Sequence, residues 1–455
     1  MKTRKSIMVA MAVMLVMTWV PVTYGAVSPE EAAKLGTTLT GVGAEKAGNK
    51  DGTIPPFTGG LKKPPANYKP GSGRFPDPFA GEKPLFSINA QNMNQYIDKL
   101  TEGTKGIMQK YPTFRVDIYK THRTNGTADF VINNTAKNAV KAMTYNDGLS
   151  LKGARAGVPF PIPKDGYEAM WNHLLRWEGR AIDGHWRAYI VDAKGYCIQV
   201  QDMDVILEYP YYDEDDKRFD SDWYFKCRFL YHGPARKAGE AVILFDPINM
   251  YEKQRIAYQY LPGQRRTKLA PEIGFDTPDG GTAGSSCYDD NFLFIGSMER
   301  YHFKLIGKKE MYVPYNCYRA NWEAKRDELF GKQHMNPDLM RFELHRVWVV
   351  EATLRPGKRH VYAKRRFYID EDSWTAVAAE SYDAGGRLFR AGYAYNSPNY
   401  DEPMSNARFY SIYDLIGGVY SGIAWPAEEG GYLRTTKPRP ERFFSPNVLA
   451  SGGIR

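Results

Sequence analysis

Four segments between residues 346 and 395 alternate apolar and polar side chains, and short turns separate them. RVWVVEATL places one apolar set on a single strand face, namely Trp348, Val350, Ala352 and Leu354. After a type II turn at PG, HVYAKRRFYI returns with a second apolar set, Val361, Ala363, Phe367 and Ile369. SWTAVAAESY and RLFRAGYAY follow, joined by the turn DAGG. The pattern predicts neighbouring antiparallel strands with one apolar face and one wetter face, which carries Glu351, Thr353, Lys364 and Arg366.

Most of the chain after residue 114 has the same strand-and-turn character. FRVDIY and DFVI are predicted as early strands, and HWRAYIVDAKGYCIQVQ as a hairpin with its turn at DAKG. DWYFKCRFLY places five residues on one strand face: Trp223, Phe225, Cys227, Phe229 and Tyr231. AVILF and RIAYQYL follow it. Many strands, few helices and no repeat predict an α+β, mostly β fold, in which a few helices cover a large curved antiparallel sheet.

The first 25 residues have the three parts of a secretory signal peptide: a basic head, an apolar run over residues 7–20, and small residues before Ala26. No Cys follows the apolar run, so lipidation is not expected. No later run is long and apolar enough to span a bilayer. We therefore expect a soluble periplasmic protein with its signal peptide cleaved.

The charge of the chain limits its partners. Removing Lys2, Arg4 and Lys5 with the signal lowers the formal net charge from +9 to about +6. This mild positive charge favours transient contact with anionic membrane lipid. No dense block of Lys and Arg occurs, so nucleic-acid binding is not expected.

Residues 26–84 are predicted as a short helix and an extended arm, and residues 85–455 as a single domain. Ser28 and Glu31 match a capping box at the start of the short helix. The arm is rich in Gly, Pro, Lys and Thr, so we expect it to be ordered only along the body of the domain. A longer helix is predicted from Ala90 to Lys110, with two glycines that weaken its second half.

The stretch GVPFPIPKDGYEAMWNHLLR raises the question of catalysis, because Glu168, Asn172 and His173 fall in one predicted helix. Its three prolines fix an extended segment with few backbone donors. Asp165 is a natural N-cap for a helix over residues 166–176. We predict a strap and a lid helix over the sheet, with the polar trio explained by the helix start and by a solvent face.

No other motif commits the chain to a reaction. The eight histidines show no HxH or HExxH spacing, so no metal site is expected. Ser285 lies in no GxSxG elbow, and DEDDKRFDSD is better explained as a solvated hairpin tip than as an EF-hand loop. Asp289 and Asp290 resemble a carboxylate pair, but neighbours on a strand point to opposite faces. Pairing with Arg265 or Arg266 is the preferred interpretation.

The chain has four cysteines and no CxxC pair: Cys197, Cys227, Cys287 and Cys317. In an exported protein we expect two disulfides, and we prefer the sequential pairing of Cys197 with Cys227 and of Cys287 with Cys317. Four unpaired buried thiols are the alternative.

Aromatic residues make up 14% of the chain and are the one feature that points to a ligand. Several fall on predicted inward faces and could enclose an apolar cavity: Tyr258, Tyr260, Trp348, Phe367 and Trp374. Such residues usually form a filled core, and the pattern alone favours the core.

The stretch YQYLPGQRRTKLAP resembles the exported bacterial family called domain of unknown function 1329, which is related to outer-membrane lipoprotein-sorting proteins. Other similar stretches run over nearly the whole mature chain: GTTLTGVGAEKAGNKDGTIPPFTGGL, GVPFPIPKDGYEAMWNHLLR, CYDDNFLFIGSMERYHFKLIGKKEMYVPYN and ESYDAGGRLFRAGYAY. The resemblance implies a fold like LolA and LolB, in which an incomplete antiparallel barrel wraps around lid helices and leaves a cavity for acyl chains. It also implies a resistance-nodulation-division type transporter and an outer-membrane protein as partners.

The leading hypothesis is a periplasmic binding or shuttle protein for a hydrophobic, lipid-like ligand, with no catalytic function and no cofactor. We expect the ligand to meet Tyr258, Tyr260, Trp348, Phe367, Trp374 and Trp171. One of Arg265 and Arg266 would meet a ligand carboxylate or a lid helix. One rival is an envelope hydrolase with a nucleophile or carboxylate pair in a cleft. The other is an assembly factor with a wide apolar patch and no cavity.

Overall fold

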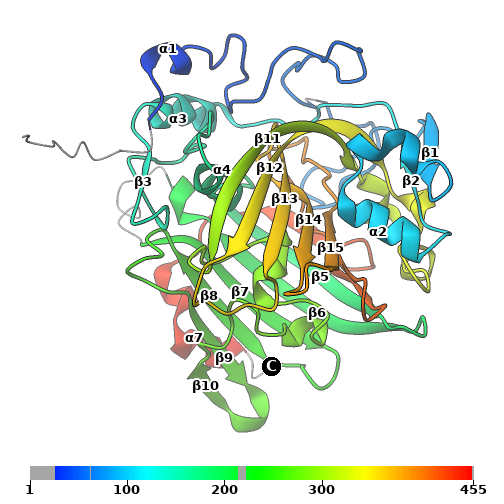
Figure 1. Cartoon of the computed structure of the whole chain (residues 1–455). Helices are drawn as coiled ribbons and strands as arrows, with labels where there is room; N and C mark the ends of the chain where they lie inside the picture. Colours follow the sequence, from blue (N-terminus) through cyan, green and yellow to red (C-terminus); the bar gives the residue numbers. More distant parts are fainter. Residues whose placement is uncertain (1–25, 62, 214–221, 453–455) are drawn as a thin grey trace, which may run out of the picture.

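The computed structural model describes residues 26–61, 63–213 and 222–452 (Figure 1). The predicted signal peptide and residues 214–221 of the acidic stretch lie outside the described residues. The strands are β1 (Phe86–Asn89), β2 (Arg115–Ile118), β3 (Met143–Tyr145), β4 (Ser150–Lys152), β5 (Ala181–Val191), β6 (Cys197–Glu208), β7 (Trp223–Gly233), β8 (Ala241–Pro247), β9 (Ile256–Leu261), β10 (Arg266–Leu269), β11 (Tyr301–Pro314), β12 (Phe342–Leu354), β13 (Lys364–Asp370), β14 (Ala376–Tyr382), β15 (Leu388–Ala394), β16 (Tyr410–Asp414), β17 (Tyr420–Trp425) and β18 (Tyr432–Thr435).

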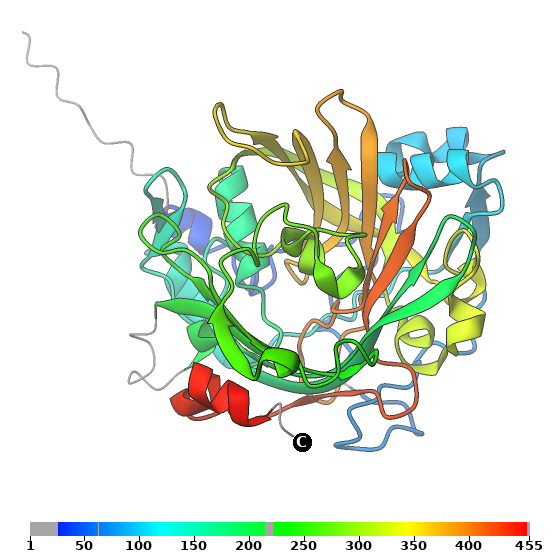
Figure 2. The ribbon, with the colours of Figure 1, turned by 90° about the horizontal axis from the view of Figure 1, so that it is seen from below.

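Apart from the β3–β4 hairpin, these strands form one 16-stranded sheet. Its order is β1-β2-β12-β13-β14-β15-β16-β17-β5-β6-β7-β8-β9-β10, with β11 paired to β12 and β18 paired to β5. Neighbours are antiparallel except for one parallel residue pair between β2 and β12. The end strands β1 and β10 are not paired with each other in the described part of the chain, and the sheet is strongly curved, with loops and short helices inside the curve (Figure 2). The predicted α+β, mostly β fold with an incomplete barrel is confirmed.

The predicted hairpins form with the expected partners. The late meander is β12 to β15, and Val350 lies opposite Phe367 in its first pair. HWRAYIVDAKGYCIQVQ becomes the end of β5 and the start of β6, with Val191 opposite Cys197. Asp192 stabilises the turn between them because its Oδ1 accepts backbone hydrogen bonds from Lys194 and Tyr196, both at 2.9 Å.

Helices lie on both sides of the sheet. They are α1 (Pro29–Ala32), η1 (Met93–Lys99), α2 (Glu102–Lys110), α3 (Asp129–Ala139), α4 (Gly166–Leu174), η2 (Pro210–Tyr212), η3 (Pro262–Gln264), η4 (Gly280–Thr282), η5 (Tyr288–Leu293), η6 (Arg319–Glu323), α6 (Arg326–Leu329), η7 (Pro337–Leu339), η8 (Glu441–Phe444) and α7 (Pro446–Gly452). α4 packs on β11 and β12, α2 on β14 and β15, and α7 on β8, β9 and β10 (Figure 1). Among the described residues, no helix has both the length and the apolar character that crossing a bilayer requires.

The meander is buried on both faces over much of its length. On one face of β12, Trp348 and Val350 belong to the core that contains α4. On the other face, Val349 belongs to a second core that contains apolar residues of α2. The predicted wetter face is found only near the end of β12, where Glu351 and Arg366 form an ion pair at 2.7 Å. The prediction was incomplete because α2 covers β14 and β15 on that face and the second core buries Val347 and Val349 of β12.

Two predictions about local structure need correction. DFVI is not a strand, because it opens α3, whose buried residues recur at helical spacing: Val131, Thr135, Asn138 and Ala139. The helix predicted over residues 90–110 is interrupted at Leu100, where the backbone is extended. Thr101 then caps α2 by accepting a hydrogen bond from the Thr104 backbone at 3.0 Å.

The glycines of α2 allow close packing on the sheet. A Cβ at Gly103 would lie 2.9 Å from Ala391 Cβ, and one at Gly106 would lie 2.8 Å from Leu388 Cδ2. Gly103 is therefore needed for close contact with Ala391 of β15, whereas a larger residue at Gly106 would only require the end of the Leu388 side chain to move. The second half of the predicted helix is the regular α-helical half.

The N-terminal segment is tied to the rest of the chain by hydrogen bonds. Ser28 and Glu31 exchange the two hydrogen bonds of the predicted capping box, both at 3.2 Å. Further along, Val42 accepts a hydrogen bond from Trp374 Nε1 at 2.9 Å. The Arg74 guanidinium donates to several backbone carbonyls, including that of Ala427 at 2.7 Å. These hydrogen bonds place parts of the arm against the rest of the chain.

The strap and α4 form as predicted, but the polar trio is not on a solvent face. Asp165 caps α4 by accepting from the Glu168 backbone at 2.9 Å. Glu168, Asn172 and His173 are all at most 1% exposed. Asn172 holds the strap, because Oδ1 accepts from the Phe160 backbone at 2.9 Å and Nδ2 donates back to it at 2.7 Å.

His173 connects three segments instead of facing water. Its Nδ1 accepts from the Ala376 backbone and its Nε2 donates to the Phe294 carbonyl, both at 3.1 Å. Burial holds the pKa of His173 well below its ordinary value, so the ring is neutral. The prediction of a solvent face failed because these backbone partners come from segments far away in sequence.

The predicted disulfides are not formed, and all four cysteines are free thiols. Cys227 lies opposite Leu207 on β6, whereas Cys197 starts that strand ten positions earlier. That separation is about 33 Å along a strand, against a limit of about 7 Å between the Cα atoms of a disulfide. Cys287 lies beside Tyr362, and Cys317 donates to the Arg341 carbonyl in the second core. The alternative of unpaired thiols is therefore the correct one, with Cys197 exposed and the other three buried.

Replacing Glu168 with Gln should stabilise the protein above neutral pH. Burial raises the pKa of Glu168 to about 7, and its Oε1 has no hydrogen-bond partner. A carboxyl with a raised pKa binds its proton more tightly in the folded state, so wild-type stability falls as pH rises from about 4.5 to about 7. Urea unfolding should show Glu168→Gln to be more stable by about 2 kcal/mol at about pH 8 and little changed at about pH 5.

The half-exposed Glu272 provides the control, because Glu272→Gln should change stability equally little at both pH values. An equal effect of Glu168→Gln at the two pH values would contradict the assignment.

Thiol titration tests the cysteine assignment. Without reductant, the unfolded chain should react with four equivalents of a maleimide, and the folded chain with at most one, at Cys197. Two or fewer equivalents in the unfolded chain would show that disulfides form.

Candidate functional site

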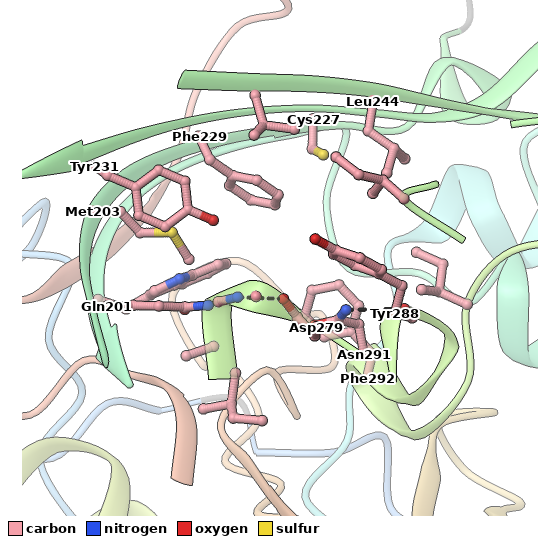
Figure 3. A pocket seen from close by; sticks show the side chains of 18 of the residues that line it. Gln201, Met203, Cys227, Phe229, Tyr231, Leu244, Asp279, Tyr288, Asn291 and Phe292 are labelled. Carbon is pink, nitrogen blue, oxygen red and sulfur yellow. Dashed lines mark hydrogen bonds between the residues drawn. The ribbon is translucent and has the colours of Figure 1, made fainter. Parts of the chain in front are cut away.

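An apolar cavity of about 300 Å³ lies between the strands β5 to β9 and the segment of residues 270–295 (Figure 3). β7 supplies a run of alternate residues to its wall, from Phe225 through Cys227 and Phe229 to Tyr231. The rest of the lining is Trp186, Gln201, Met203, Lys237, Glu240, Val242, Leu244, Arg255, Gln259, Ile273, Asp279, Gly280, Gly281, Tyr288, Asn291, Phe292, Ile295, Tyr410, Ile423 and Ala424. The cavity therefore has a wall of strands on one side and a cover of irregular backbone on the other.

The wall is apolar because its strands alternate. On β7 and β8, the apolar residues at every second position face the cavity, as Phe229 and Leu244 do in Figure 3. On β9, Gln259 faces the cavity. Its neighbours Tyr258 and Tyr260 point to the other face and pack in the cluster beneath α7. The two tyrosines were predicted to line a ligand site, but the cavity-facing residue of β9 is Gln259, which lies between them.

The cover, residues 270–295, contains the short helices η4 and η5. Asp279 caps η4 by accepting a hydrogen bond from the Gly281 backbone at 2.6 Å. Inside η5 the backbone leaves the helical region, and Phe292 has a positive φ of 53°. This turn presents Asn291 and Phe292 to the cavity (Figure 3). Tyr410 then fixes Asn291 by donating to its Oδ1 at 2.5 Å.

An ionic cluster anchors the cover to the meander. The fully buried Arg365 donates from Nη1 to Asp289 Oδ2 at 3.0 Å and from Nη2 to Asp290 Oδ1 at 2.9 Å. Although burial raises the pKa of Asp289, Arg365 and His360 lower it to about 2. Arg390 also lies 3.4 Å from Asp290. Asp289 and Asp290 lie in a 3₁₀ helix and not on a strand, so both carboxylates can reach one guanidinium. The predicted partners were Arg265 or Arg266, and this prediction was wrong because the partner is Arg365.

Four charged side chains line the cavity, and three of them, Lys237, Arg255 and Asp279, are paired or shifted toward neutrality; the fourth is Glu240. Burial raises the pKa of Asp279 and lowers the pKa of Lys237. Arg255 is paired with Asp246 through two hydrogen bonds of 2.7 and 2.8 Å. The site therefore favours an uncharged or weakly polar molecule over a strongly charged one.

Two buried polar atoms in the wall have no hydrogen-bond partner within the described residues. They are the Nε1 donor of Trp186 and the Oε1 acceptor of Gln201, on side chains that are 2% and 4% exposed. Both residues line the cavity, and Gln201 is visible there in Figure 3. Buried polar atoms are usually paired, so an unpaired donor and an unpaired acceptor on two cavity-lining side chains suit the polar group of a ligand.

The other residues predicted to bind a ligand occupy filled parts of the core. Trp171 is fully buried in α4 and donates to the Gly148 carbonyl at 2.9 Å. Phe367 packs against Phe294, with ring centroids 5.5 Å apart. Trp348 stacks on Trp374 at 6.2 Å. None of these four is among the cavity-lining residues.

Arg265 and Arg266 lie away from the cavity, at the exposed turn between β9 and β10. Arg265 has a positive φ of 48° and ends η3 in the left-handed region, so the pair does not continue one strand. Neither residue can meet a ligand in the cavity from this turn.

The sequence did carry a signal for the cavity wall, in the alternation of DWYFKCRFLY. Phe225, Cys227, Phe229 and Tyr231 were predicted to share a face, and they do. The cover had no comparable signal. GFDTPDGGTAGSSCYDDN has no periodicity, and its Asp279 could not be separated from ordinary loop residues.

Two groups of side chains in the described residues have the spacing to hold a metal ion. In the buried group of His345, Asp370 and Asp372, the carboxylate of Asp372 already accepts two hydrogen bonds from Arg123, at 2.6 and 2.8 Å. Asp372 is therefore committed to its ion pair with Arg123, and Asp370 Oδ2 accepts from Tyr315 and Ser373, whereas Asp370 Oδ1 has no hydrogen-bond partner in the described part of the chain. The second group, His185, Asp204 and His232, lies on β5, β6 and β7.

Replacing Arg365 with Met should destabilise the protein by about 3–5 kcal/mol, because two buried carboxylates would lose their shared partner. Urea unfolding measures this loss. The control is Arg387→Met, which removes an exposed ion pair with Asp383 and should cost less than about 1 kcal/mol. Equal losses at the two positions would contradict the anchoring role of Arg365.

Comparisons with known proteins agree with the family suggested by the sequence. An uncharacterised protein of Pseudomonas aeruginosa is 38% identical over 445 residues, which cover 94% of this chain and 95% of the relative. A domain from Vibrio parahaemolyticus, described as an outer-membrane lipoprotein-sorting protein domain, aligns with a TM-score of 0.43 at 17% identity, over 63% of this chain and 98% of that domain.

Two further solved structures are similar over part of the chain. A DUF1329 family protein from Desulfovibrio piger gives a TM-score of 0.40 at 12% identity, over 60% of this chain and 92% of its own. A LolA superfamily protein from Nitrosomonas europaea gives 0.34 at 13% identity, over 61% of this chain and 94% of its own. The family described as "Protein of unknown function (DUF1329)" matches residues 87–450. The chain therefore belongs to the DUF1329 family, as its resemblance to that family predicted.

Proposed function

We propose that the protein is a periplasmic carrier that binds a lipid-like molecule between β5–β9 and the cover of residues 270–295. The observation that carries this proposal is the apolar cavity, which has a continuous strand wall and a small number of polar atoms. A volume of about 300 Å³ is at the lower end of the range for ligand pockets. The site would therefore take one slender chain or a small ring system.

Burial of apolar surface would supply the binding free energy. Each 100 Å² of ligand surface removed from water contributes about 2.5 kcal/mol before the entropic cost of association. Phe229, Leu244 and Phe292 provide contact surface on opposite sides of the cavity (Figure 3).

The unpartnered atoms suggest the polar part of the ligand. A hydroxyl or a carboxamide could accept from Trp186 Nε1 and donate to Gln201 Oε1. Asp279, whose pKa burial raises, could accept a further hydrogen bond or donate one when protonated. A free carboxylate is disfavoured beside Asp279, so we propose a neutral amphipathic lipid as the ligand.

Location and partners belong to the same proposal. The predicted signal peptide supports export to the periplasm, where a carrier could pass its ligand to a transporter of the resistance-nodulation-division type or to an outer-membrane protein. An assembly factor would need no cavity, which makes the carrier the better supported of the two. For a hydrolase, Asp289 and Asp290 are poor candidates because Arg365 engages both carboxylates.

Phe229→Ala should weaken ligand binding about tenfold, because the variant loses one face of the cavity wall. Binding can be followed by fluorescence with dansyl-undecanol as the probe. The matched control is Phe245→Ala on β8, which removes an equally half-buried ring from the opposite face of the same sheet. Phe245→Ala should leave probe affinity unchanged.

Organic extraction and native mass spectrometry of protein purified from a bacterial envelope should recover a bound lipid from the wild type and less from Phe229→Ala. The proposal fails if no lipid is recovered and the probe does not bind. It also fails if the two Phe variants lose affinity equally.

A further inference from the structure

Two histidines and two aspartates come together on the face of the sheet opposite the cavity. His185 lies on β5, Asp202 and Asp204 on β6, and His232 on β7. Each alternates along its strand with a cavity-lining residue, as His185 does with Trp186. His185 and Asp204 are directly opposed in the β5–β6 register. Strand pairing thus places four potential ligands on one face, although they are far apart in the sequence.

The Asp204 carboxylate lies between the two imidazole rings. Its Oδ1 is 2.7 Å from His185 Nδ1, and its Oδ2 is 2.8 Å from His232 Nε2. The ring centroids are 5.9 Å apart. These three side chains can each direct one ligand atom to a common point, since the atoms all lie within 4.8 Å of one another.

We propose that His185, Asp204 and His232 bind a divalent transition-metal ion, with zinc as the best match. Two imidazole nitrogens and one carboxylate oxygen form a ligand set that zinc accepts, with a fourth position open to water. Ligand atoms about 2.1 Å from a tetrahedral ion are about 3.4 Å apart. The two nitrogen–oxygen pairs, at 2.7 and 2.8 Å, therefore need to separate by less than about 1 Å. His232 and Asp204 are about half exposed, at 46% and 47%, which gives them the freedom to make this adjustment.

Asp202 contacts the side of the His185 ring that faces away from Asp204. Its Oδ1 lies 2.8 Å from His185 Nε2, the ring nitrogen that would not bind the metal. This contact has an ion-pair distance without hydrogen-bond geometry, and the negative charge of Asp202 favours the tautomer that carries its proton on Nε2 and leaves the Nδ1 lone pair free for the ion. Asp202 is therefore a positioning residue for the first ligand.

The surrounding charges favour a cation. With neutral imidazoles, Asp202 and Asp204 bring two negative charges to this face. Arg187 contacts Asp202 at 3.2 Å but also lies 3.5 Å from Glu428, so its charge is shared with a third carboxylate. The net local charge is negative until a metal ion or protons bind.

The site would brace the wall of the proposed carrier. The metal ligands come from three adjacent strands, and the opposite faces of these strands carry Trp186, Met203 and Tyr231 in the cavity. A bound ion would hold β5, β6 and β7 in register directly behind that wall. The metal site does not depend on the carrier proposal, because its ligands do not contact the cavity.

Isothermal titration of untagged full-length protein with zinc chloride tests the proposal, after treatment with a chelator at about pH 7.5. We expect one zinc ion per chain, and cobalt in place of zinc should give the intense visible absorption of a four-coordinate ion. His185→Ala and His232→Gln should each weaken zinc binding at least about thirtyfold. Asp202→Asn should weaken it about tenfold with the stoichiometry unchanged, as expected for a positioning residue.

His302→Gln is the control, because His302 is an exposed histidine on β11, away from this group. Its zinc affinity should equal that of the wild type. His232 is also exposed, so His232→Gln should fold, and its urea midpoint without zinc verifies this. The proposal is overturned if the wild type does not bind zinc, or if His232→Gln binds it as tightly as the wild type. It is also overturned if lowering the pH stabilises the protein while zinc has no effect, since the cluster would then bind protons only.

Discussion

Arg365 places one buried guanidinium between two adjacent carboxylates, and the candidate site depends on this contact. The contact joins β13 of the meander to η5 of the cover, which are more than 70 residues apart in the sequence. Removing water from one such charge is costly, so the cluster is stable only when Asp289, Asp290 and Arg365 are all present. Because these groups determine where η5 lies, they also determine how far Asn291 and Phe292 stand from the strands that form the cavity wall.

The concave side of the sheet is occupied in two different ways. Beside β11 to β14, α4 and large aromatic residues fill the space, and Trp171 and Phe367 are fully buried there. Beside β5 to β9, the irregular cover does not fill the space completely, and a cavity remains. The sequence left a choice between a filled core and a cavity. The structure contains both, in neighbouring parts of one sheet.

Features with a fixed period were predictable from the sequence, and features that depend on distant partners were not. The hairpins, the meander and the shared face of β7 follow from an alternation that the sequence displays. The tyrosines of β9 were assigned to the wrong face because a shift of one position reverses every side chain of a strand. His173 was placed on a solvent face because its partners, Phe294 and Ala376, are more than 100 residues away.

The same distinction applies to the site. The strand wall could be recognised in part, since its residues alternate. The cover could not, because contacts with residues such as Arg365 and Tyr410 hold it in place, and no local pattern reports them. The disulfide prediction failed for a related reason. The spacing of cysteines in the sequence does not indicate how strands are aligned. In the structure Cys227 lies opposite Leu207, near the end of β6, whereas Cys197 is the first residue of that strand.

The central claim is that the space between β5–β9 and residues 270–295 holds a ligand. A crystal structure of protein purified from a bacterial envelope, without exposure to detergent, tests it most directly. The account predicts continuous elongated electron density between Phe229 and Phe292, with its polar end at Trp186 and Gln201. A cavity closed by the side chains that line it, or one containing only ordered water, would contradict the account.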